Sequence, residues 1–233
     1  MSMKTLKTTL ALASGALVLS LAATPVLAAE ATTPAAAGEP NLTGKWINAT
    51  PEAPLKATSG AIPLTAKGKE AYAKNKKEKA AGEDPLTLCH MHGEPRLLFT
   101  KYPFLIMQYG NHVDFLHQAN HTFRITYFGE KLDPDADPIW LGHPTAKWDG
   151  KTLVIDADNY NDETWLDYSG LPHGEKLQTE ERYTLSADGK TINGTVKITD
   201  PDYYSKPWTA AFTLKKEPGY SLEQYSCMAD HKM

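Results

Sequence analysis

Several features that would assign the chain to a known chemical class are scarce or absent. The 233 residues include only two cysteines, and they contain no Gly-x-Ser-x-Gly motif, no His-Glu-x-x-His motif and no glycine-rich phosphate loop. Serine hydrolase, zinc protease and nucleotide-dependent chemistry therefore have little support. An excess of positive charge is also missing, because the formal net charge is −4. We accordingly expect no nucleic-acid partner and no binding to an anionic membrane.

Long apolar runs are missing too, except near the N-terminus. Lys4 and Lys7 precede an apolar stretch at 10–21, and the small residues of a cleavage site follow at 26–28. This order predicts an export signal over residues 1–28 and a periplasmic or secreted mature protein. A membrane anchor is the alternative, but polar residues interrupt the stretch, which is shorter than the ~20 residues of a bilayer span. Since no later segment is apolar enough, we expect no membrane span after cleavage.

The rest of the chain divides into a short lead-in and one domain. Residues 29–40 are mostly small, include prolines and lack apolar periodicity, so we expect them to be disordered. Residues 41–233 are long enough for a single domain with a hydrophobic core. Within it, residues 65–82 are rich in Lys, Ala and Glu, which predicts a short N-terminal helix. Its lysines are more typical of a solvated face than of a binding patch.

The two cysteines, Cys89 and Cys227, are far apart in the sequence. In an oxidising compartment an even number of cysteines favours a disulfide over free thiols. Such a bridge would close most of the domain into a loop, which is worth about 4–5 kcal/mol in chain entropy. The alternative is that each cysteine is a separate soft ligand for a metal.

From residue 97 onward, short runs of aromatic and β-branched residues alternate with turn signals, which is typical of an antiparallel meander. Asp-Gly pairs at 149–150 and 188–189 predict hairpins with two-residue turns. Gly110-Asn111 indicates a third hairpin. The paired segments are 139–148 with 151–157, 178–187 with 190–199, and 103–109 with 112–117.

The segments 112–117 and 121–128 are expected to be joined by a three-residue loop that places His117 and His121 opposite each other. Alternation along the pair then defines a core face. The apolar residues on that face would be Val113, Phe115, Phe123, Ile125 and Tyr127.

Two more strands are expected, at 208–214 and near 224–227. This number of strands favours closure of the sheet, because closure removes exposed edges. We therefore predict a mainly β fold: an antiparallel meander that closes into a barrel, with one short helix and long loops.

The start of the predicted domain, Leu-Thr-Gly-Lys-Trp at 42–46, resembles the Gly-x-Trp opening of lipocalin-like barrels. Longer segments over most of residues 41–227 resemble an uncharacterised family of secreted bacterial proteins. They lie at 94–96, 102–104, 139–143, 148–154, 161–167, 172–173, 181–183, 200–201 and 207–208. The resemblance implies one domain and a lipocalin-like barrel, and it implies no mechanism. The segments around the two cysteines depart from the family, because here they are rich in His and Met.

A first candidate site combines polar residues from apolar strand faces. His143 follows Ile139 and Leu141 in alternation, and Glu181 alternates with Tyr183, so both are expected to point into the barrel. A buried carboxylate is costly unless it is paired, protonated or bound to a metal.

The loop 157–177 adds His173, which would complete a His₂-carboxylate site for a divalent metal with His143 and Glu181. Either histidine with Glu181 or Asp200 would instead suit acid–base chemistry. A structural alternative pairs Glu181 with Arg124 or Arg182 and gives the histidines ordinary hydrogen bonds.

A second candidate site lies beside the cysteines, where imidazole and thioether groups favour copper, especially Cu(I). Its residues are His90, Met91, His92, Met228, His231 and Met233. A frayed C-terminus that happens to contain His and Met is the alternative. The expected His117 and His121 pair is a third, smaller chelating candidate.

Three functions follow from these features. The favoured one is a barrel that binds a small, partly apolar molecule. Its ligand-binding residues would be Arg124, Tyr183, Trp208, Phe115 and Phe123. The others are a metal-dependent enzyme of the hydrolase or lyase type and a periplasmic copper-binding protein. A barrel fold alone does not choose among them.

Overall fold

The computed structural model describes residues 38–129, 135–224 and 227 of the chain. These residues all fall within one compact unit, residues 32–233. The predicted export signal at 1–28 and most of the predicted lead-in at 29–40 lie outside the described residues, so both remain predictions. Within the described ranges, no helix is both long and apolar enough to span a membrane.

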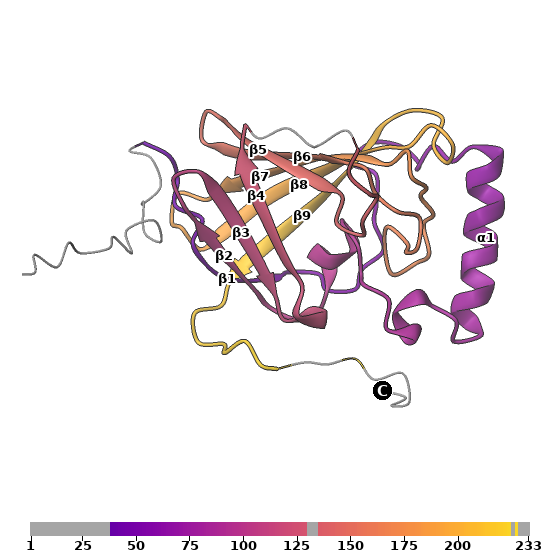
Figure 1. Ribbon diagram of the computed structural model, residues 1–233, viewed down its shortest axis with the longest axis horizontal. Coiled ribbons are helices and arrows are strands. Elements are labelled where there is room, and N and C mark those ends of the chain that lie inside the picture. The colour runs from indigo at the N-terminus through magenta and orange to yellow at the C-terminus, as the bar shows by residue number, and fades with distance from the viewer. Residues whose placement is uncertain (1–37, 130–134, 225–226, 228–233) are drawn as a thin grey trace, which may run out of the picture. The chain divides into compact units, whose positions relative to one another are not determined.

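Nine strands close into a barrel (Figure 1). The strands are β1 (Gly44–Asn48), β2 (Phe104–Gln108), β3 (His112–His117), β4 (Phe123–Phe128), β5 (His143–Asp149), β6 (Thr152–Asp158), β7 (Gln178–Leu185), β8 (Thr191–Thr199) and β9 (Trp208–Lys216). Closure comes from the antiparallel pairing of β1 with β9. The predicted mainly β barrel is confirmed, and it is consistent with the lipocalin-like barrel that the Gly-x-Trp opening implies.

One strand pair departs from the predicted antiparallel meander. β4 and β5 are parallel, and only Tyr127 with Thr145 and Phe128 with Ala146 are paired. β5 therefore begins at the same end of the barrel as β4, so the two strands do not form a hairpin.

The predicted helix is present as α1 (Ala66–Ala80). Thr65 caps its start by accepting a hydrogen bond from Gly68 N at 3.0 Å, which satisfies one of the free N–H groups of the first turn. Asn75 fixes the helix to the connection 159–177 by donating to Gly170 O at 2.9 Å. All lysines of α1 are exposed, as expected of a solvated face. Three short 3₁₀ helices complete the described elements: η1 (Pro85–Leu88), η2 (Arg96–Phe99) and η3 (Ala119–His121).

The connections at the two ends of the barrel differ in length. At one end the strands are joined by tight turns at 109–111, 150–151 and 186–190. At the other end, called the loop end below, the connections are 49–103, 118–122, 159–177 and 200–207. Long connections commonly carry binding and catalytic groups on a rigid scaffold. The loop end is therefore where a site is expected.

The three predicted hairpins are present, and two of their turns differ from the prediction. The turn at Gly110-Asn111 is as predicted, with Tyr109 N donating to His112 O at 2.9 Å. In the second hairpin Asp149 pairs with Thr152, so the turn lies one residue later than predicted. In the third, Ser186 N donates to Thr191 O at 2.8 Å, which leaves the longer turn 187–190. The strand expected near 224–227 is wrong, because residues 221–224 and 227 lie in no strand.

The interior face of β4 is the opposite of the predicted one. Arg124 and Thr126 are buried, whereas Phe123 is 67% exposed, Ile125 43% and Tyr127 41%. The apolar residues of this strand thus face outward, and its polar residues face the core.

A turn before β4 causes this reversal. In η3, Asn120 and His121 both have positive φ, and the pairing beyond the turn is shifted by one residue. Leu116 therefore lies opposite Phe123, and His117 does not face His121. A shift of one residue exchanges the two faces of a strand. The predicted chelating pair is accordingly not formed.

The predicted disulfide between Cys89 and Cys227 is present, with Cα atoms 5.6 Å apart. It ties the chain that follows β9 to residues 89–103, which are called the cover segment below. This segment contains η2 and leads into β2.

Candidate functional site

A buried ion pair crosses the inside of the barrel near its loop end. Arg124 Nη1 donates to both carboxylate oxygens of Glu181, at 3.0 and 2.9 Å. Both side chains are at most 1% exposed. Since β5 and β6 separate β4 from β7 in the sheet, the pair spans the interior and does not follow the barrel wall. One of the two pairings that the sequence offered for Glu181 is therefore correct.

The cover segment adds a second carboxylate to this pair. Glu94 Oε1 lies 3.7 Å from Arg124 Nη1, and the Glu94 side chain is 1% exposed. Gly93 makes this approach possible, because it has φ of +68° and a Cβ atom there would lie 2.5 Å from Thr164 Cγ2. We call Arg124, Glu181 and Glu94 the charge cluster.

Tyr183 completes the hydrogen bonding of Glu181. Its hydroxyl donates to Glu181 Oε2 at 2.5 Å. The ring is fully buried, with centroids 5.6 Å from Phe115 and 5.3 Å from Phe212. The predicted ligand-binding residues Tyr183 and Phe115 thus lie in the interior beside the charge cluster.

The charge cluster holds one cation and two carboxylates. Burial and the negative charge of Glu181 together raise the pKa of Glu94 to about 8, against the opposing effect of Arg124. The two carboxylates in turn raise the pKa of Arg124. Because Glu94 is protonated at neutral pH, the ion pair of Arg124 with Glu181 leaves the cluster with no net charge.

His117 lies on the inner face at the end of β3, next to this cluster. Its ring stacks on Phe104, with centroids 4.6 Å apart. Burial, together with the positive charge of Arg124, lowers the pKa of His117 to about 3. The imidazole is therefore neutral, with one nitrogen that donates and one that accepts.

Many polar atoms of these residues have no hydrogen-bond partner within the described part of the chain. They are Arg124 Nε and Nη2, both carboxylate oxygens of Glu94, both ring nitrogens of His117, and Thr126 Oγ1. Buried polar groups in native proteins are nearly always hydrogen-bonded, and each exception has a cost of about 1–3 kcal/mol. Their concentration at one place inside the barrel is what singles out this site.

The cover segment that carries Glu94 is fixed at several points. Arg96 forms a two-pronged ion pair with Asp84, at 2.9 and 2.6 Å, and its guanidinium lies 4.5 Å from the ring centroid of Tyr168. Asn48 Nδ2 donates to Leu98 O at 2.9 Å, and Thr164 Oγ1 donates to the His92 carbonyl at 2.9 Å. Glu94 is thus placed by the fold, as a preorganised site requires.

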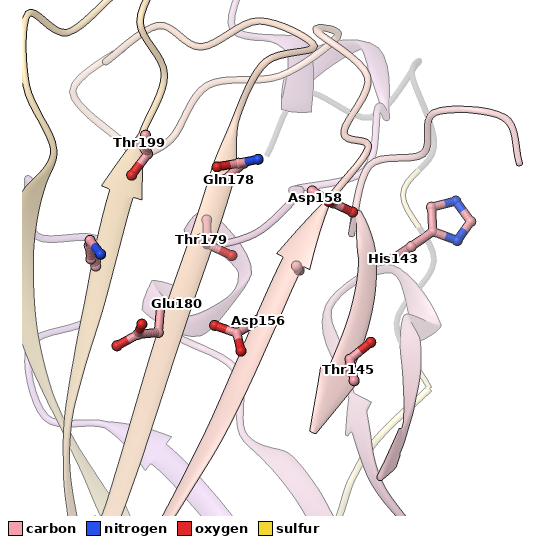
Figure 2. A pocket seen from close by; sticks show the side chains of 10 residues that line it. His143, Thr145, Asp156, Asp158, Gln178, Thr179, Glu180 and Thr199 are labelled. Carbon is pink, nitrogen blue, oxygen red and sulfur yellow. The ribbon is translucent and has the colours of Figure 1, made fainter. Parts of the chain in front are cut away.

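His143 does not reach the interior. It pairs with Asp158 at the start of β5, whereas the inward positions are Pro144 and Ala146, opposite Ala157 and Ile155. Figure 2 shows its ring at the edge of a groove of about 380 Å³ on the outer face of β5–β8. The prediction failed because residues 139–142 form a turn, so their alternation does not continue into the strand.

His173 and Asp200 are buried in the loop-end connections. Burial lowers the pKa of His173, whose ring centroid lies 6.5 Å from that of Tyr160. Asp200 accepts hydrogen bonds from Gly174 N at 2.8 Å and from Asp202 N at 3.1 Å, so its visible role is to hold a turn. Among the described residues, neither side chain forms a hydrogen bond or an ion pair with the charge cluster.

The predicted metal site is not assembled. His143 is outside the barrel and Glu181 is inside it, bound to Arg124. Across the described ranges, no three His, Cys, Asp or Glu side chains come together as a metal-binding group.

The predicted copper site is only partly described. Met228, His231 and Met233 lie outside the described residues. His92 is buried, which lowers its pKa to about 4, and His90 Nδ1 lies 3.4 Å from Glu163 O. Met91 packs against the small cluster around Leu97. Copper binding therefore stays a prediction.

The remaining predicted ligand-binding residues divide between the two faces. Trp208 is buried at the start of β9, which belongs to the loop end. Phe123 lies on the outer face, so its prediction as an interior residue is wrong. Sequence reasoning missed Glu94 and His117 as members of one site with Arg124. Glu94 lies in a connection between strands, where the alternation of apolar and polar residues gives no signal.

Comparison with known proteins assigns neither a family nor a function to the chain. No family model matches the sequence, and a search of curated proteins gives no match. The fold and the site together define a closed β-barrel with a buried, incompletely hydrogen-bonded charge cluster at one end.

Proposed function

We propose that this is an exported barrel protein that binds a small, partly apolar molecule inside its loop end. The observation that carries the proposal is the set of unpartnered polar atoms on Arg124, Glu94 and His117. A ligand that hydrogen-bonds to them would offset the cost of burying them. Its apolar part would lie against the rings that line the same end, among them Phe104 and Phe115.

The predicted export signal and the resemblance noted in the sequence are the basis for a periplasmic or secreted location in this proposal. Nothing in the charge cluster suggests a bound metal, because Arg124 already neutralises Glu181. The proposed site is therefore a binding site for an organic molecule.

The ligand should accompany the protein through purification. Mass spectrometry of molecules released from untagged protein, purified under native conditions, should find one compound near unit stoichiometry. If the protein carries no such compound and its melting temperature responds to no small molecule, the proposal is wrong.

Replacing His117 with phenylalanine should raise the free energy of unfolding by about 1–2 kcal/mol while removing ligand binding, because two unpaired buried nitrogens disappear. Denaturation of ligand-free protein and mass spectrometry of the purified variant measure the two effects. His143→Phe is the matched control: it makes the same change outside the barrel and should alter neither. A purely structural His117 would instead lose stability and binding together.

A further inference from the structure

The unused edge of Arg124 indicates what kind of group the ligand presents. Nη1 is occupied by Glu181, whereas Nε and Nη2 have no partner among the described residues. These two nitrogens lie on the same side of a guanidinium group and direct parallel N–H bonds outward. They suit a planar group with a strong oxygen acceptor, such as a carboxylate or a carbonyl.

The charges around Arg124 distinguish between these two acceptors. Glu181 already balances the guanidinium, and Glu94 lies 3.7 Å from it. A ligand carboxylate would add a second ionised carboxylate, beside Glu181, around one cation in a fully buried site, which is costly. A cationic ligand would lie against Arg124 itself. An uncharged carbonyl group meets neither penalty.

The other unpartnered atoms complement such a group. Glu94 and His117 together offer donors and acceptors, because the carboxyl group is protonated at neutral pH and the imidazole is neutral. An amide presents an oxygen that accepts from Arg124 and an N–H that donates to Glu94 or His117. The stacked rings of Phe104 and His117 would favour a flat body beside it.

We propose that the ligand is an uncharged molecule that carries an amide group, open or cyclic, on a flat apolar body. This inference rests on the proposed binding of a small molecule at the loop end. It adds that Arg124 Nε and Nη2 hold the carbonyl oxygen and that Glu94 and His117 hold the amide nitrogen.

Three planar probes of nearly the same shape test the charge of the ligand: benzamide is neutral, benzoate is anionic and benzamidine is cationic. Each is titrated at pH 6.5 into the full-length exported protein labelled with ¹⁵N, and the Nε–Hε signal of Arg124 is followed by NMR. Benzamide should move this signal and bind at least about tenfold more tightly than either charged probe, which corresponds to about 1.4 kcal/mol.

Three variants assign the response to the site. His117→Phe should abolish the benzamide shift at Arg124, and His143→Phe should keep it. Glu94→Gln retains a donor and an acceptor, so it should still bind benzamide. If benzoate or benzamidine binds more tightly than benzamide and moves the Arg124 signal, the ligand class is wrong and the proposed function stands. If no probe moves that signal, or if His117→Phe responds like the unmodified protein, the ligand class and the interior site are both wrong.

Discussion

Replacing Arg124 with methionine should lower the free energy of unfolding by about 3–5 kcal/mol, the usual effect of removing one partner of a buried ion pair. The substitution removes both hydrogen bonds from Arg124 to Glu181. It also removes the positive charge 3.7 Å from Glu94. Urea denaturation at neutral pH measures the loss.

A control and a rescue accompany this variant. Arg182 directly follows Glu181 on β7, but its side chain is 36% exposed and forms ion pairs with Asp149 and Glu180. Arg182→Met should therefore cost no more than about 1 kcal/mol. The double variant in which Arg124 and Glu181 are both methionine should recover most of the lost free energy of unfolding, because no uncompensated charge from the pair remains. If Arg124→Met is as mild as Arg182→Met, the ion pair is not the element that stabilises the interior.

Stability should be greatest near pH 6.5 and should decline on both sides. Above this pH the important group is Glu94, whose pKa is raised from 4.5 to about 8 on folding. The unfolded chain has already released that proton while the folded chain keeps it. The free energy of unfolding should therefore fall as pH rises toward 8, by up to about 1.4 kcal/mol per pH unit.

Below pH 6.5 the buried histidines dominate. The pKa falls from 6.5 to about 3 for His117 and to about 4 for His92 on folding, so the unfolded chain binds protons that the folded chain does not. Each histidine lowers the free energy of unfolding by up to about 1.4 kcal/mol per pH unit as the solution is acidified. Burial also lowers the pKa of His173, which therefore acts in the same direction. Together these histidines outweigh the opposite contribution of Glu94 between pH 4.5 and 6.5.

Glu94→Gln separates the two limbs of this profile. It should abolish the decline between pH 6.5 and 8 and keep the acid limb, which becomes steeper between pH 4.5 and 6.5 because the opposite contribution of Glu94 is gone. Urea denaturation at closely spaced pH values measures both limbs. Glu180→Gln, on the outer face of β7, is the control and should leave both limbs unchanged. An alkaline decline that persists in Glu94→Gln would show that Glu94 does not hold its proton in the folded protein.

The barrel could be predicted from the sequence because the signals for its hairpins and its helix each lie within a few neighbouring residues. Gly110-Asn111 and the two Asp-Gly pairs identify the hairpins, and Thr65 followed by a Lys- and Ala-rich run identifies α1. The disulfide followed from the cysteine count. These features depend on turn chemistry and composition, which act over a few residues.

The site could be predicted only in part because it depends on the strand register and on contacts between residues far apart in the sequence. Arg124 alternates with apolar residues that face solvent, so periodicity placed it on the wrong side. Two residues with positive φ in η3 shift the register, and neither is a glycine. Glu94 lies in a connection outside the strands, where the alternation of apolar and polar residues does not predict which side chains are buried. Only the three-dimensional closure of the barrel brings the two carboxylates to one guanidinium.

The pairing of β1 with β9 has a consequence for how the chain folds. During synthesis from the N-terminus, β1 is made long before its partner β9. Cys89 is likewise made 138 residues before Cys227, so the disulfide cannot form until the end of synthesis. Until then one edge of β1 and the edge of the growing sheet are unpaired, and such edges promote aggregation. The sheet would thus stay open until β9 is present, and the Cys89–Cys227 bridge would be among the last contacts to form.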